Sequence, residues 1–198
     1  LDLMQAAGFA VVAERLNMWR YLAHFRAVHR GQFFTTMKTT AVRKLLPESW
    51  GFLCPVHTPD GEPCGLLNHL AAAALVIASP PRSDASEALA SKVIALGVLP
   101  TGVDSADGAL VPPRAHLPVL VDGVVVGSAS ALTCARVGAA LRALKVAEPP
   151  TIEPTLEVGL VLPDTGSSIY PGLYLFTGAA RLVRPVLQCA SGRVELIG

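Results

Sequence analysis

The stretch from Cys54 to His69 contains the side chains best suited to metal chemistry. Cys54, His57, Cys64 and His69 are all residue types that bind zinc. Their spacing matches no standard zinc finger, and a proline lies next to each cysteine. The sequence therefore favours buried thiols and surface imidazoles over a zinc site.

Asp60 and Glu62 are a close acidic pair near a strongly basic segment. Two-metal phosphoryl or nucleotidyl transfer needs a cluster of carboxylates, and the other acidic residues are dispersed. The sequence also lacks a glycine-rich phosphate loop, a Gly-x-Ser-x-Gly elbow and a paired-histidine metal helix. We therefore expect no metal or other cofactor bound by this chain, and any catalytic metal would need ligands from elsewhere.

Residues 15–44 form a basic window that contains no Asp or Glu. Interleaved cations and aromatic rings are typical of a surface that follows phosphates and stacks on bases. A cationic amphipathic helix with its aromatic residues in a core is the alternative. The window contains Arg15, Arg20, Arg26, Arg30, Lys38, Arg43 and Lys44, together with Trp19, Tyr21, Phe25, Phe33 and Phe34.

The whole-chain figures restrict the class of protein. The chain has 198 residues, a net charge of +1 and 52% hydrophobic residues, which suits one domain or two small ones. A net charge near zero would by itself argue against a nucleic-acid partner. The argument fails here because the basic residues are concentrated in the basic window. The longest apolar run, Leu70–Ala78, is too short to span a bilayer. Four cysteines are too few for a disulfide framework and indicate a reducing, intracellular compartment. The start at Leu1-Asp2 has no leader pattern, and we expect the chain to be part of a longer protein.

The periodicity of apolar residues predicts a helix over 1–30, which Gly31 would end. A polar loop or loose hairpin is expected over 32–46, and prolines predict rigid turns over 47–63, with a tight turn at Thr58–Gly61. The run 66–77 fits either a helix or a buried strand. A polar link at 79–84 is a candidate boundary, and a helix with a Ser86 cap is expected over 86–96.

The remaining patterns predict an α+β fold. Asp122-Gly123 indicates a hairpin between strands 117–121 and 124–127. A helix over 130–146 is expected to bury Leu132, Ala135, Ala139, Leu141 and Leu144. Strands are expected over 155–162, 173–177 and 182–189, with a turn at 163–166.

Residues 50–68, from Trp50 to Asn68, resemble the signature of the second-largest subunit of multisubunit DNA-dependent RNA polymerases. That signature reads Trp/Tyr-Gly-x-x-Cys-Pro-x-x-Thr-Pro-Glu/Asp-Gly, followed by Gly-Leu and Asn. The matching positions are Trp50, Gly51, Cys54, Pro55, Thr58, Pro59, Asp60, Gly61, Gly65, Leu66 and Asn68.

The flanking sequence resembles the same family. His24 and Arg26 match a His-x-Arg element, and Arg43 matches an arginine seven residues before the aromatic-Gly pair. Further on, Val121-Asp122-Gly123 with Gly127 resembles the hairpin of the external region, and Arg181–Pro185 resembles its Gly-Arg-x-x-Arg-Pro strand. His57 and the run Arg43–Trp50 resemble the RNA polymerase I form, because the polymerase II and III forms typically have an acidic residue at the position of His57.

The resemblance implies a fork region at 1–79 and an external region at 80–198, with a hairpin, a helix and antiparallel strands. The fork lies where downstream DNA opens beside the active centre. Its position implies nucleic-acid contacts by Arg26, Arg30, Phe33, Phe34 and Lys38. It also places Arg43, Asp60 and Glu62 near the incoming nucleotide. Arg43 could instead brace the turn through Asp60 or Glu62.

The resemblance further implies a role in ribosomal RNA synthesis in the nucleolus of the nucleus. Magnesium would be held mainly by the largest subunit, and this chain alone should be inactive. Expected partners are the largest subunit, other polymerase subunits, template and downstream DNA and nascent RNA, with no membrane. The alternative is a self-contained, non-enzymatic α+β module that binds RNA or an acidic partner through the basic window.

Overall fold

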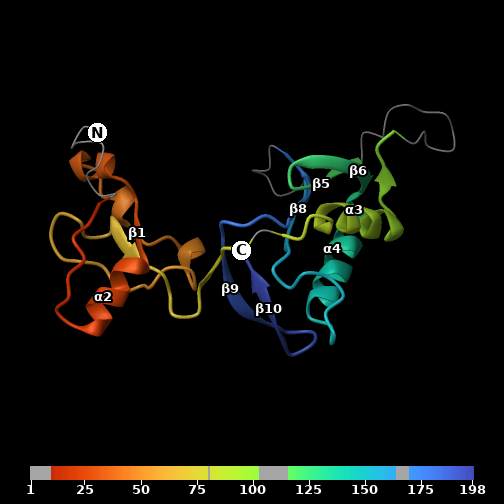
Figure 1. Cartoon of the computed structure of the whole chain (residues 1–198). Helices are drawn as coiled ribbons and strands as arrows, with labels where there is room; N and C mark the ends of the chain where they lie inside the picture. Colours follow the sequence, from red (N-terminus) through yellow and green to blue (C-terminus); the bar gives the residue numbers. More distant parts are fainter. Residues whose placement is uncertain (1–9, 80, 103–115, 164–169) are drawn as a thin grey trace. The chain divides into compact units, whose positions relative to one another are not determined.

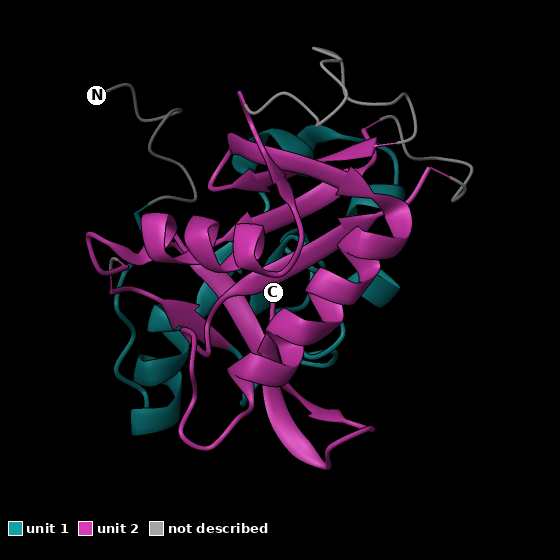
Figure 2. Ribbon diagram, turned by 90° about the vertical axis from the view of Figure 1, so that its right-hand side faces the viewer, with its two compact units in different colours: residues 1–74 teal, residues 75–198 magenta. Residues whose placement is uncertain are grey.

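The computed structural model describes residues 10–79, 81–102, 116–163 and 170–198 (Figure 1). The chain divides into two compact units, unit 1 at residues 1–74 and unit 2 at residues 75–198 (Figure 2). This division does not test the expected functional boundary at residue 79, which stays a prediction. No helix within the described ranges is long and apolar enough to cross a membrane.

Over its described residues, 10–74, unit 1 contains one short α-helix, α2 (Met18–Phe25). The expected helix over 1–30 is therefore confirmed only at residues 18–25 and is wrong over 10–17 and 26–30, while residues 1–9 lie outside the described ranges. The helix starts where Asn17 adopts an extended backbone and its side chain accepts a 2.7 Å hydrogen bond from Arg20 N. It ends at Arg26, and the next residues pair as a strand. Helical periodicity in the sequence did not reveal either of these local boundaries.

Strand β1 (Ala27–His29) pairs antiparallel with β2 (Leu67–His69). The connection between them contains three 3-10 helices, η1 (Gln32–Thr36), η2 (Ala41–Arg43) and η3 (Pro47–Ser49). The predicted loop over 32–46 is thus built from short helical turns and not from a hairpin. The turn-rich segment that follows lacks helices and named strands from Trp50 to Leu66, as expected. Its hydrogen-bonded turn starts at Gly61, three residues later than predicted, with Cys64 N donating to Gly61 O.

The ambiguous run 66–77 forms two short strands, β2 and β3 (Leu75–Ile77), and no helix. The two strands belong to different sheets, and β3 belongs to unit 2. Periodicity could not separate them, because each strand is only three residues long.

Unit 2 is built around a five-stranded sheet with the order β4-β6-β5-β8-β7. The β5 and β8 strands are parallel, whereas the other neighbours are antiparallel. The predicted hairpin is confirmed, since Asp122 and Gly123 have φ angles of 49° and 86° and join β5 to β6. The strands are β4 (Leu99–Pro100), β5 (His116–Val121), β6 (Val124–Ser130), β7 (Glu157–Val161) and β8 (Gly172–Phe176).

Two helices cover one face of this sheet, α3 (Ala85–Ala95) and α4 (Ala131–Lys145). Both predicted helices are confirmed, although α3 begins after Asp84 and not at a Ser86 cap. Helix α4 is capped by Ser130, whose hydroxyl accepts from Thr133 N. The core contains Leu89 and Val93 of α3, Cys134, Val137 and Leu141 of α4, and Val119, Val121, Leu173 and Leu175 of the strands.

The predicted buried face of α4 was only partly right. Leu141 is fully buried, but Leu132 is 70% exposed and Ala139 is also exposed. The buried positions are Cys134, Val137, Gly138, Leu141 and Lys145. The helix itself carries small apolar residues on several of its sides. Hydrophobicity alone therefore did not show which side packs on the sheet.

A second sheet in unit 2 has three antiparallel strands in the order β10-β9-β3. It contains β9 (Arg181–Gln188), which was predicted, and β10 (Arg193–Ile197), which was not. The predicted turn at 163–166 falls almost entirely on residues outside the described ranges. The fold is α+β, as the sequence indicated.

Candidate nucleic-acid interface

The turn-rich segment of unit 1 is held by hydrogen bonds in place of regular secondary structure. Thr58 Oγ1 donates to Leu67 O over 2.7 Å and accepts from Gly65 N over 3.0 Å. The buried Asn68 side chain donates to Gly65 O, and Cys54 N donates to His69 O. Two side chains of the motif, Thr58 and Asn68, therefore satisfy main-chain groups of this segment.

Arg43 braces the same segment through main-chain oxygens. Its Nη1 donates to Glu62 O over 2.5 Å and to Cys64 O over 2.8 Å. Gly65 lies against Arg43 with a φ of +74°, and a Cβ atom there would overlap the Arg43 carbonyl oxygen. The predicted bracing role therefore has geometric support, with the contact made to the Glu62 main chain.

Other arginines of the basic window also bond main-chain carbonyls. Arg26 Nη2 donates to Ala71 O over 2.7 Å. Arg30 Nη2 donates to Lys44 O over 3.0 Å, and Arg30 N donates to Leu66 O over 2.9 Å. Arg26 and Arg30, which we expected to contact nucleic acid, thus hold neighbouring segments of unit 1 together.

The two arginines nearest the start of the window have side-chain partners. Arg20 Nε donates to Glu14 Oε2 over 2.7 Å, and the Arg15 guanidinium lies 4.9 Å from the centre of the Tyr21 ring. The lysines differ, because Lys38 and Lys44 are exposed and have no side-chain partner among the residues that the structure describes.

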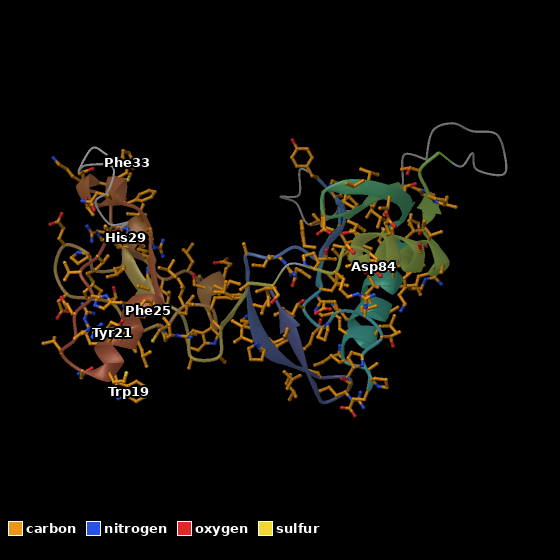
Figure 3. The ribbon with its side chains drawn as sticks, in the orientation of Figure 1. Trp19, Tyr21, Phe25, His29, Phe33 and Asp84 are labelled. Carbon is orange, nitrogen blue, oxygen red and sulfur yellow. The ribbon has the colours of Figure 1, made fainter. Side chains whose placement is uncertain are left out.

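The aromatic residues of the window do not form one continuous surface. Phe33 is 73% exposed and meets the half-buried Phe34 edge to face at 5.7 Å. Trp19 is 81% exposed, and Figure 3 shows it and Phe33 at opposite ends of unit 1. The α2 aromatics are not core residues, because α2 buries no side chain. This observation removes the alternative of an amphipathic helix with aromatic residues in a core.

The candidate zinc ligands are not arranged around a common point. The His57 and His69 rings stack face to face at 3.6 Å and 11°, and His69 Nδ1 lies 3.1 Å from Ala23 O. Among the described residues, no three His, Cys, Asp or Glu side chains are placed to hold one metal ion. Burial lowers the pKa of His69, and the neighbouring His57 lowers it further. His69 of β2 thus contacts both Ala23 O of α2 and the exposed His57 ring, and the expected surface imidazole is wrong for His69, which is buried.

Asp60 and Glu62, the remaining nucleotide-side candidates, are exposed on the segment that Arg43 braces. The absence of a three-ligand group in the described part of the chain also applies to magnesium. Asp60, Glu62 and the other carboxylates of the described residues are therefore not grouped as a magnesium site would need. The sequence placed Lys44 in the basic window but not among the expected contact residues, and only the hydrogen-bond partners of the arginines distinguish it from them.

Comparison with known proteins relates both units of the chain to RNA polymerase subunits. Residues 11–76 match the family model "RNA polymerase Rpb2, domain 3", and residues 126–184 match "RNA polymerase I, Rpa2 specific domain". The chain is 51% identical over 202 residues to DNA-directed RNA polymerase I subunit RPA2 of Homo sapiens. It is 46% identical over 199 residues to subunit RPA135 of Saccharomyces cerevisiae and 47% identical over 205 residues to subunit 2 of Arabidopsis thaliana.

These alignments cover 100% of this chain but only 17%, 16% and 17% of the three relatives, respectively. The chain belongs to the second-largest subunits of multisubunit RNA polymerases. Within that family it corresponds to a segment of the RNA polymerase I form. The match extends through both units, and nothing in it supports a self-contained binding module.

Proposed function

We propose that this chain contributes the fork beside the active centre of RNA polymerase I, in DNA-templated synthesis of ribosomal RNA. The observation that carries the proposal is the 51% identity over the whole chain to an RNA polymerase I subunit. The complete enzyme is a nucleotidyltransferase, and the isolated chain is expected to be inactive.

The geometry of unit 1 supports separate roles within the fork. Phe33 is an exposed ring that can stack on a base, and Lys38 is an exposed cation that can contact phosphate. Phe34 supports Phe33 from the side, and Arg26 and Arg30 support the loop through carbonyl oxygens. These five residues together are the proposed nucleic-acid side.

Arg43, Asp60 and Glu62 form the proposed nucleotide side. The guanidinium of Arg43 fixes the main chain of the segment that presents both carboxylates. Magnesium bound by the largest subunit would supply the charge stabilisation for nucleotidyl transfer. This chain would contribute the position of its turn and the exposed groups on it.

The proposed partners are the largest subunit, the other RNA polymerase I subunits, the template and downstream DNA, and the nascent RNA. Membership of an RNA polymerase I subunit family implies a nuclear location. We propose the nucleolus as the site of action, because ribosomal RNA synthesis is the proposed reaction.

The test is a hybrid polymerase in which this chain replaces the matching segment of the Saccharomyces cerevisiae relative. The hybrid should synthesise RNA on a DNA template, and the Phe33→Ala/Phe34→Ala variant should lose elongation rate or duplex opening. An inactive but fully assembled hybrid contradicts the proposed function. Normal elongation and opening by the double variant contradict the role of the two rings.

A further inference from the structure

The cations of the basic window fall into two groups. Five arginines are engaged within the protein, by carbonyl oxygens, a carboxylate or an aromatic ring: Arg15, Arg20, Arg26, Arg30 and Arg43. The two lysines have no side-chain partner among the described residues. A phosphate that approaches unit 1 would therefore find its least engaged positive charges on Lys38 and Lys44.

Lys44 is the better positioned of these two lysines. Its carbonyl oxygen accepts the hydrogen bond from Arg30 Nη2, and its N–H, directly after η2, donates to Ala41 O, the first residue of that helix. Its neighbour Arg43 is fixed by two further hydrogen bonds. The main chain of Lys44 is thus held on both sides, while its ammonium group faces solvent. A cation on a preformed main chain loses less conformational entropy on binding than one on a free loop.

We propose that Lys44 contacts the phosphodiester backbone of nucleic acid in the polymerase, with Arg30 and Arg43 as positioning residues. The inference rests on the proposed function, since it needs the fork to lie beside nucleic acid. It adds a binding residue to that function and gives the two arginines a different role. A lysine ammonium binds phosphate as a compact point charge and needs no particular approach geometry.

The experiment uses the complete hybrid polymerase with Lys44→Gln. Binding to a DNA bubble with a downstream duplex is measured at several salt concentrations. Loss of one phosphate contact should lower the slope of log K against log salt by about 0.9 for double-stranded DNA. The same relation predicts binding about eightfold weaker at 0.1 M salt. Lys44→Arg should restore the slope, because it restores the charge.

Lys92→Gln is the matched control, since Lys92 is a partly exposed lysine on α3 of unit 2. Its slope should equal that of the unchanged hybrid. Scaffolds without the downstream duplex, and scaffolds without RNA, identify the source of the phosphate. The effect of Lys44→Gln should disappear with whichever strand Lys44 contacts.

An unchanged slope for Lys44→Gln overturns the proposal. Loss of a polymerase subunit from this variant, with an unchanged slope, also overturns it and indicates a protein contact. Either result in an active hybrid leaves the proposed function intact. By contrast, an assembled hybrid that neither binds DNA nor makes RNA contradicts the proposed function itself.

Discussion

The buried ion pair between α4 and β10 allows a sharp prediction about the stability of unit 2. Lys145 and Glu195 have side chains that are 1% and 3% exposed, and Lys145 Nζ lies 3.2 Å from Glu195 Oε1. Lys145 Nζ also donates to Leu196 O over 2.7 Å. The lysine therefore connects the second sheet to the helix through both a charge and a carbonyl.

Glu195→Gln should destabilise this connection by leaving the buried Lys145 without its counter-charge. Removing one partner of a buried pair costs about 3–5 kcal/mol. We expect about 3 kcal/mol, because the Leu196 carbonyl remains as a partner of the ammonium. This cost corresponds to roughly 100-fold faster opening, at about 1.4 kcal/mol for each factor of ten. Hydrogen exchange of the α4 and β10 amides in the 198-residue chain measures it.

Two further variants make this test decisive. Glu148→Gln is the matched control, because Glu148 forms an ion pair with Arg193 but is 79% exposed, and its loss should change exchange little. The double variant Lys145→Met/Glu195→Leu should recover most of the lost protection, since a well-packed apolar pair can replace a buried ion pair. Equal, small effects for Glu195→Gln and Glu148→Gln would refute the reasoning.

Three other predictions concern single residues. Gly127→Ala should detach β4 from β6, because the new Cβ would overlap Leu99 O, and amide exchange of residues 98–100 should rise. Asp122→Asn tolerates the positive φ but loses charge at the carboxylate that accepts from Thr177 N and Oγ1. Its unfolding free energy should fall by about 1–3 kcal/mol in denaturant titrations; no loss would contradict the role of these bonds. The His69 pKa is lowered by burial and then by His57, so the unfolded chain binds more protons in the window between the folded-state pKa and 6.5. Unit 1 should therefore lose stability as pH falls through that window, and a Trp-fluorescence unfolding series should show a smaller pH dependence in His69→Asn.

Much of unit 2 could be predicted because its local signals agree with its tertiary structure. Asp122-Gly123 supplies the two positive φ angles that the hairpin needs, and Ser130 caps the helix that follows. Strand β10 was missed because it is only five residues long and its buried position holds the charged Glu195, whereas the apolar Val194 is exposed. The reason for Glu195 in a strand appears only with its distant partner, Lys145.

Unit 1 was predicted less well because its structure depends on specific side-chain bonds. The helical periodicity over 1–30 continues past Asn17 and Arg26, where the helix actually begins and ends. The turn segment was predicted correctly from its prolines, but the bond from Arg43 to Glu62 O joins residues far apart in sequence. No local pattern indicates that an arginine will bind a carbonyl oxygen in preference to a carboxylate or a phosphate.

The same physical constraint links the motif to the charge of the basic window. A segment without helices or ladders leaves main-chain carbonyls that need donors, and each arginine offers five N–H groups. Arg26, Arg30 and Arg43 supply such donors in unit 1. The N–H groups of these three arginines are consequently engaged within the fold, and fewer cations are available to a phosphate than the sequence count suggests.

The substitution Arg43→Lys keeps the net charge but removes the guanidinium that braces the turn segment. It should therefore impair the polymerase although the net charge is unchanged. Both oxygens accept from the same Nη1 of Arg43, and the flexible ammonium of lysine is not held by a planar guanidinium that aims this nitrogen at them. Full activity of Arg43→Lys would show that charge, and not the brace, is what this position contributes.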